Sequence, residues 1–161
     1  MTMTIETGQS VPDATFMTMG EDGPAPMPSA DLFSGKRVVL FAVPGAYTPT
    51  CSAKHLPGFK EHGAAIKAKG VDTIACTSVN DVFVMDAWGK EQDAGDVVML
   101  ADGNGEFAKS VGLELDASGF GMGTRSQRYA MIVNDGKVEQ LFVEGPGEFQ
   151  VSSAEHVLDN L

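Results

Sequence analysis

The residues best suited to chemistry lie in one short segment, residues 43–52. This segment holds Cys51, the hydroxyl of Thr48 three residues earlier, and the prolines Pro44 and Pro49. If a helix begins at the cysteine, its unpaired N–H groups and partial positive charge stabilise a thiolate, the nucleophilic form of the side chain. The prolines restrict the backbone, so the loop can hold a fixed concave pocket. Thr48 can then donate a hydrogen bond to a peroxide oxygen and accept its proton.

A thiolate at the start of a helix can attack an acyl carbon, a disulfide or a peroxide. Acyl transfer normally uses a histidine base beside the nucleophile; His55 lies four residues after Cys51, and its reach depends on a bend at Pro57. Disulfide exchange normally uses a Cys-x-x-Cys pair, which this sequence lacks. Peroxide reduction needs a thiolate, hydrogen-bond donors for two oxygens and a cation to hold the thiolate. The residue types therefore favour a peroxide.

Cys76 is the other of the two cysteines, which are too few for a disulfide framework. It lies in the predicted strand 71–79, where burial is expected, so we interpret it as an inert core thiol. A resolving role after local unfolding and a regulatory role stay open.

Other side chains are interpreted as structural. His55 and Cys51 lie at helical spacing, but two ligands do not make a metal site, so neither a metal nor a cofactor is predicted. The remaining predictions are two exposed helix histidines, His62 and His156, and two core aromatics, Phe83 and Trp88.

The elements around the reactive segment alternate between strand and helix. The predicted strands are 14–19, 37–43, 71–79, 97–101, 128–133 and 138–143, and the predicted helices are 52–69, 81–88, 107–111 and one that a capping box at 152–155 begins. Residues 20–29, with three alternating prolines, are interpreted as a rigid surface loop. Within helix 52–69, Phe59, Ala65, Ile66 and Ala68 are expected to pack, with a kink at Pro57.

This order of elements predicts the fold class. It is an α/β sheet, parallel in the middle and antiparallel at one edge, which fits the thioredoxin-like fold with its central mixed β-sheet flanked by helices. The apolar run 38–43 ends at Pro44-Gly45 and is typical of a strand buried on both faces. Cys51 then follows the carboxyl end of a parallel strand, where ligand sites form in open α/β folds.

Length and charge narrow the function further. The 161 residues contain no linker or repeat, so a single domain over residues 1–161 is expected. The formal charge of −11 repels nucleic acid and anionic membranes alike. No apolar stretch approaches the ~18 residues of a membrane-spanning helix. Residues 1–6 lack a basic segment followed by an apolar one, so no secretory signal is predicted and a cytoplasmic location is expected.

The pattern Pro44-x-x-x-Thr48-x-x-Cys51 is similar to the active-site signature of the peroxiredoxins. The longer string over residues 44–59 resembles the type II, peroxiredoxin-five-like branch, and further matches at 78–84, 87–88, 100–102 and 123–129 extend over nearly the whole chain. The resemblance implies a thioredoxin-like fold in which Cys51 is the peroxidatic cysteine, while Thr48 and Pro44 shape the pocket.

The resemblance also implies an arginine beside the sulfur. The family places it immediately before a strand, which maps it to Arg128 here, with Arg125 as the second candidate. Its guanidinium would stabilise both the thiolate and the departing oxygen. The implied reaction forms a sulfenic acid on Cys51 and releases water or an alcohol.

Some type II relatives carry a resolving cysteine near the position of Ser152 or Ser153, where this chain has serines. The resemblance therefore implies a one-cysteine mechanism with an external thiol, glutathione with glutaredoxin first and thioredoxin second. Likeness to the family also implies a homodimer. Two other functions stay open: a peroxide sensor that signals through oxidised Cys51, and a thioredoxin-like disulfide reductase.

Overall fold

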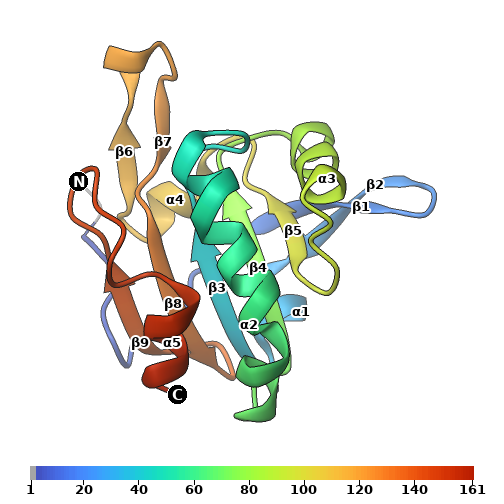
Figure 1. Cartoon of the computed structure of the whole chain (residues 1–161), viewed down its shortest axis with the longest axis vertical. Coiled ribbons are helices and arrows are strands. Elements are labelled where there is room, and N and C mark those ends of the chain that lie inside the picture. Colours follow the sequence, from blue (N-terminus) through green and yellow to red (C-terminus); the bar gives the residue numbers. More distant parts are fainter. Residues whose placement is uncertain (1–2) are drawn as a thin grey trace.

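A seven-stranded mixed sheet forms the centre of the computed structural model, which describes residues 3–161 (Figure 1). Met1 and Thr2, which belong to the segment 1–6 where no secretory signal is predicted, lie outside the described residues. The strand order is β2-β1-β5-β4-β3-β8-β9. The strands are β1 (Thr15–Gly20), β2 (Gly23–Pro28), β3 (Arg37–Ala42), β4 (Thr73–Ser78), β5 (Val98–Ala101), β8 (Tyr129–Asn134) and β9 (Lys137–Val143). A separate two-stranded sheet joins β6 (Glu114–Asp116) to β7 (Thr124–Ser126).

The three central strands β3, β4 and β5 are parallel, and the strands outside them run antiparallel at both edges rather than at one. The sheet is thus the mixed one predicted, with one more antiparallel edge. The extra edge is the hairpin β1–β2, which joins the sheet through β5.

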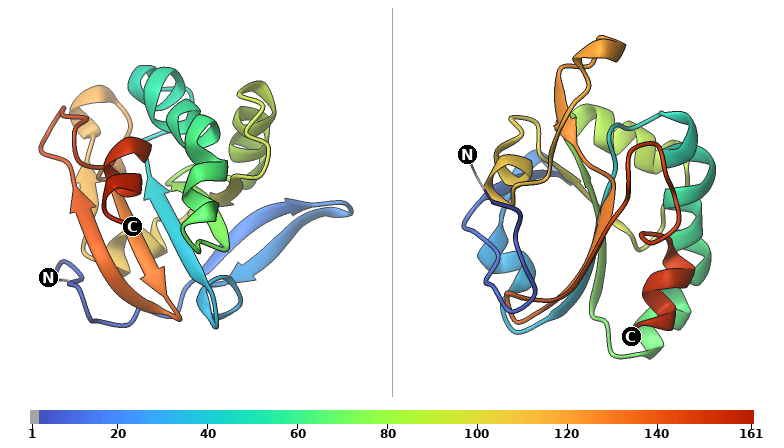
Figure 2. Two further views of the ribbon diagram at one scale, coloured as in Figure 1. Left: turned by 60° about the horizontal axis from the view of Figure 1, so that its bottom comes forward. Right: turned by 90° about the vertical axis from the view of Figure 1, so that its left-hand side faces the viewer.

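Helices cover both faces of the sheet, as the two views of Figure 2 show. They are α1 (Ser29–Phe33), α2 (Leu56–Ala68), α3 (Val82–Glu91), α4 (Glu106–Ser110) and α5 (Ala154–Asp159), with a π-helix η1 (Cys51–His55) and a 3₁₀ turn η2 (Ser118–Phe120). Strand β3 contributes side chains to the hydrophobic core on both faces of the sheet. Val39 and Phe41 pack beneath α2 and α3, while Val38 and Leu40 pack on the opposite face. The predicted double-sided burial of this strand is confirmed.

The prediction of a loop over residues 20–29 was wrong, because β2 forms there. Its prolines stand opposite Thr15, Met17 and Met19 of β1, in every second position. Alternate residues of a strand direct their N–H groups to the same side. The N–H groups that the three prolines lack would therefore all have pointed to the free edge of the sheet, where no strand needs them. An edge strand without outward donors resists pairing with other chains.

Several local predictions also need correction. Phe59 and Ile66 of α2 are buried as expected, but Ala65 and Ala68 are exposed. Helix α5 begins after Ser153, whose hydroxyl accepts from the His156 N–H, so Ser152 is free to take another role. The β6–β7 pair was missed because its strands have only three residues each.

Three side chains have other surroundings than predicted. Phe83 is 65% exposed on α3 rather than in the core, whereas Trp88 is buried. His62 is only partly exposed and its Nε2 lies 3.0 Å from a Glu155 carboxylate oxygen. His156 is also partly buried, edge-on to Phe142. Within residues 3–161, no helix has the length and apolar character that a bilayer span requires.

Candidate active site

Cys51 begins the π-helix η1, which continues directly into α2. The wider turn is closed by the bond from the Leu56 N–H to the Cys51 carbonyl, and such turns occur frequently at functional sites. The predicted helix 52–69 thus consists of the π-helix η1 followed by α2, and Pro57 stands in the first turn of α2, where a missing N–H costs least. Cys51 and His55 are both fully buried in this turn.

Two side chains hold the sulfur of Cys51. Thr48 Oγ1 lies 2.7 Å from Sγ and also 2.7 Å from the Gly45 carbonyl oxygen. A hydroxyl has a single hydrogen, so Thr48 donates it either to the sulfur or to the carbonyl. One terminal nitrogen of Arg128 donates to Sγ at 2.9 Å. The thiolate therefore has one neutral donor and one cationic donor beside it.

Arg128 is the residue immediately before β8, the strand that pairs with β3. Its other terminal nitrogen donates to His55 Nδ1 at 2.8 Å. The guanidinium carbon also lies 5.9 Å from the centre of the Phe149 ring, within reach of a cation–π interaction. Because the guanidinium fork is rigid and planar, these contacts fix the direction of the nitrogen that faces the sulfur.

His55 is fixed as one neutral tautomer. Arginine can only donate, so Nδ1 accepts from Arg128, and Nε2 carries the hydrogen that it donates to the Ser152 carbonyl at 2.9 Å. Burial and then the Arg128 charge lower the pKa of His55 to about 3, although the bond to Ser152 opposes the shift. With both ring nitrogens engaged, His55 orients Arg128 and does not act as a base toward Cys51.

Glu144 holds the loop that carries this carbonyl. Its carboxylate is only 7% exposed and accepts from the N–H groups of Gln150, Val151 and Ser152 and from the Ser152 hydroxyl. Burial alone would raise the pKa of Glu144, but these hydrogen bonds outweigh it and hold the pKa below its ordinary value. A continuous set of hydrogen bonds thus runs from Glu144 through Ser152, His55 and Arg128 to the sulfur of Cys51.

We expect Glu144→Gln to lower the free energy of unfolding by about 2–3 kcal/mol, because several buried donors lose their charged acceptor. The peroxidase rate should fall as well, since the Ser152 carbonyl no longer holds His55 in place. Urea unfolding and peroxide consumption measure the two effects. Glu155→Gln, which removes an equal charge from the surface pair with His62, should change unfolding by less than about 1 kcal/mol. Equal effects from both variants would contradict this account.

Two other residues considered for the site, Pro44 and Arg125, have different positions in the structure. Pro44 and Arg128 both line one cavity, whereas Arg125 donates to the carbonyls of Val79 and Met122. Arg125 therefore braces the loop beside β7, and Arg128 is the arginine that contacts Cys51.

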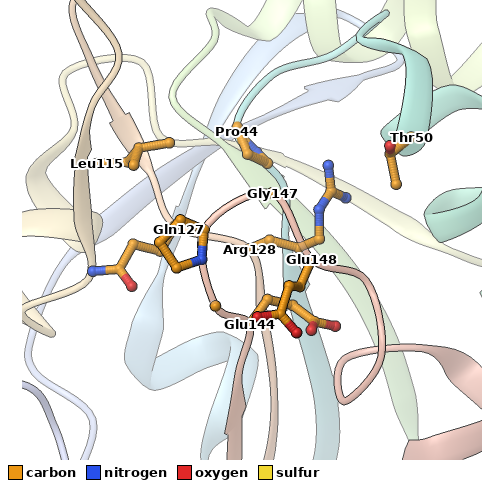
Figure 3. Close-up of a pocket in the computed structure, with 10 residues that line it drawn as sticks. Pro44, Thr50, Leu115, Gln127, Arg128, Glu144, Gly147 and Glu148 are labelled. Atoms are coloured by element: carbon orange, nitrogen blue, oxygen red, sulfur yellow. The ribbon is translucent and has the colours of Figure 1, made fainter.

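The cavity has a volume of about 370 Å³. Figure 3 shows Pro44 and Leu115 on one side of it, the carboxylates of Glu144 and Glu148 on another, and the Arg128 guanidinium between them and Thr50. Arg128 both lines this cavity and donates to the buried sulfur, so the cavity borders the residue that holds Cys51.

Cys76 lies in the middle of β4, paired with Phe41 of β3 and Met99 of β5. It is fully buried, and burial raises the pKa of its thiol well above the ordinary value, with a further rise from the charge of Cys51. Both cysteines are free thiols. Among residues 3–161, no cluster of three or more potential metal ligands was found.

Fold and site together define a thioredoxin-like protein whose reactive centre is a cysteine flanked by an arginine and a threonine. The sequence matches the Redoxin family over residues 6–158. It is 49% identical to peroxiredoxin-2B of Arabidopsis thaliana, with 98% of each chain covered. The chain belongs to the peroxiredoxins, in their type II, peroxiredoxin-five-like branch, and it is a thiol-dependent peroxidase.

Solved structures agree with this assignment. Reduced Prx3 of Vibrio vulnificus, in complex with H2O2, superposes with a TM-score of 0.94 at 54% identity, over 97% of this chain and 98% of that one. The 1-Cys peroxiredoxin of Plasmodium falciparum, an antioxidant protein, gives a TM-score of 0.90 at 29% identity, over 98% of this chain and 100% of that one.

Proposed function

We propose that the protein reduces hydrogen peroxide and organic hydroperoxides in a one-cysteine cycle. The observation that carries this proposal is the pair of donors, Thr48 and Arg128, on the sulfur of Cys51. The Vibrio relative, whose structure contains H2O2, supports the choice of substrate.

In the first step the Cys51 thiolate attacks the nearer peroxide oxygen. A sulfur–oxygen bond forms, the oxygen–oxygen bond breaks, and the leaving oxygen takes a proton to become water or an alcohol. The sulfur is oxidised to a sulfenic acid and the peroxide is reduced. Arg128 stabilises the negative charge that moves from the sulfur to the leaving oxygen. The Thr48 hydroxyl, which donates to the sulfur in the reduced protein, donates to a peroxide oxygen during the reaction. Pro44 lines the cavity beside Arg128.

The second step needs a thiol from another molecule. Cys76 is buried within the sheet, and this chain has serines at 152 and 153, where some type II relatives carry a resolving cysteine. The sulfur of Cys51 is itself fully buried, so a donor reaches the sulfenic acid only when the first turn of η1 unwinds. Glutathione with glutaredoxin is the proposed donor system, and thioredoxin is the second choice. The 1-Cys relative from Plasmodium supports a cycle that uses one cysteine of the chain.

We expect Cys76→Ser to keep at least half of the wild-type turnover of hydrogen peroxide, because serine fills nearly the same buried volume and the cycle does not use this thiol. Consumption of peroxide is followed once with glutathione plus glutaredoxin and once with thioredoxin plus its reductase. Cys51→Ser, which cannot form a sulfenic acid, sets the zero of the assay.

Each outcome of this experiment has a definite meaning. The faster donor system identifies the physiological class of reductant. Loss of turnover in Cys76→Ser, with the fold intact by circular dichroism, would show that Cys76 resolves the sulfenic acid. If the wild-type protein consumes one equivalent of peroxide and stops with both donors, the catalytic cycle is wrong and a peroxide sensor is the better description of Cys51.

A further inference from the structure

The cavity beside Arg128 has a mixed lining that bears on which peroxides the enzyme accepts. Its apolar part consists of Pro44, Leu115 and Pro146, and its acidic part of Glu144 and Glu148. A volume of about 370 Å³ falls within the range of small-molecule sites and can hold an organic group of roughly ten non-hydrogen atoms. Hydrogen peroxide needs far less space, so the cavity suits the organic part of a larger hydroperoxide.

The charges around this cavity do not balance. Among residues 3–161, Arg128 is the single cation that lines it, and its two terminal nitrogens already donate to Cys51 and His55. Against this one positive charge stand the thiolate of Cys51 and the carboxylates of Glu144 and Glu148. A substrate that carries a negative charge would therefore meet a net negative environment in the cavity.

The two carboxylates are not equivalent. Glu144 is buried and satisfied by donors of its own loop, so its charge is partly compensated. Glu148 is exposed at the turn over residues 145–148, and none of the ion pairs formed among residues 3–161 includes it. Its side chain returns toward Gly145 at the mouth of the cavity. Glu148 is thus the uncompensated charge that an entering substrate meets.

We propose that this cavity receives the organic group of a hydroperoxide and that Glu148 makes the enzyme select uncharged hydroperoxides over those that carry a carboxylate. The inference rests on the peroxidase function proposed above. Glu148 acts on substrate specificity, whereas the chemistry at the sulfur belongs to Cys51, Thr48 and Arg128.

Two substrates that differ in one charge test the proposal: cumene hydroperoxide and the same molecule with a carboxylate para to the reacting group. The measured quantity is the ratio of their kcat/KM values, because a general effect of a variant on Cys51 cancels in the ratio. The wild-type ratio should favour the uncharged substrate. It should fall about threefold in Glu148→Gln and about tenfold in Glu148→Lys at low ionic strength, and these differences should shrink in 0.5 M salt.

Glu61→Lys is the matched control, because it changes the net charge by the same amount as Glu148→Lys. Glu61 is exposed on α2 and does not line the cavity. The proposal is overturned if Glu148→Lys and Glu61→Lys have the same ratio as the wild type, or if the wild type prefers the carboxylated substrate. Failure of the wild-type protein to turn over hydrogen peroxide would instead overturn the proposed function, so the two failures can be distinguished.

Discussion

Arg128→Lys should lower kcat/KM for hydrogen peroxide by a factor of about 10²–10³, the range found when one preorganised donor to developing charge is removed. Lysine keeps the positive charge but ends in one nitrogen, whereas Arg128 uses two nitrogens to contact Cys51 Sγ and His55 Nδ1 at the same time. A lysine that reaches the sulfur leaves the histidine without a donor, and one that reaches the histidine leaves the thiolate without a cation. Rapid mixing of the reduced protein with peroxide measures the rate directly.

Arg125→Lys is the control for this experiment. Arg125 is also partly buried and lies three residues earlier, but it donates to the backbone carbonyls of Met122 and Val79 rather than to Cys51. Its replacement should slow the reaction by less than about tenfold. If Arg128→Lys reacts within threefold of the wild type, the guanidinium fork is not what activates the sulfur. If both variants are equally impaired, loss of the loop structure explains the result better than loss of the donor.

The reactive segment could be predicted because its signals are local. A buried strand that ends at Pro44, a hydroxyl at Thr48 and a cysteine three residues later are read from adjacent positions, and the structure places Thr48 in contact with Cys51. The sequence Asn134-Asp135-Gly136 between the predicted strands 128–133 and 138–143 is a hairpin signal of the same local kind, and Asp135 and Gly136 adopt the positive φ angles that such a turn requires.

Other features depend on residues far apart in the chain. Arg128 was assigned through family resemblance, since 77 residues separate it from Cys51. The role of Glu144 had no local signal, because its donors at residues 150–152 are near in sequence but belong to a loop that contacts the site through Ser152 and the distant His55. The four-residue spacing of Cys51 and His55 did suggest a common helix face, but the direction of the imidazole depends on Arg128.

The prolines of β2 show a different limit. Three prolines within residues 20–29 are a strong signal for a loop, and the structure has a strand there. The signal fails because proline opposes only those strands that need the missing N–H. Whether a strand lies at the edge of a sheet is a property of the whole topology, and local sequence does not contain it.

The buried state of His55 predicts a stability that falls in mild acid. Its pKa is about 3 in the folded protein, where burial and the Arg128 charge lower it, and 6.5 is its ordinary value. The unfolded chain therefore binds a proton that the folded protein does not, between pH 6.5 and about 3. The stabilisation is fully present above pH 6.5 and is lost as the pH falls, with a slope that approaches about 1.4 kcal/mol per pH unit.

His55→Gln isolates this contribution. A glutamine can accept from Arg128 with its oxygen and donate to the Ser152 carbonyl with its nitrogen, but it does not titrate. Between pH 7 and pH 5, the wild type should lose about 2 kcal/mol more of its free energy of unfolding than the variant does. Urea unfolding at each pH measures the difference, and the other histidines and the carboxylates cancel because both proteins share them. Parallel loss of stability in the two proteins would mean that His55 is already solvated or protonated in the fold, and Arg128 would then lack the neutral acceptor that directs it to Cys51.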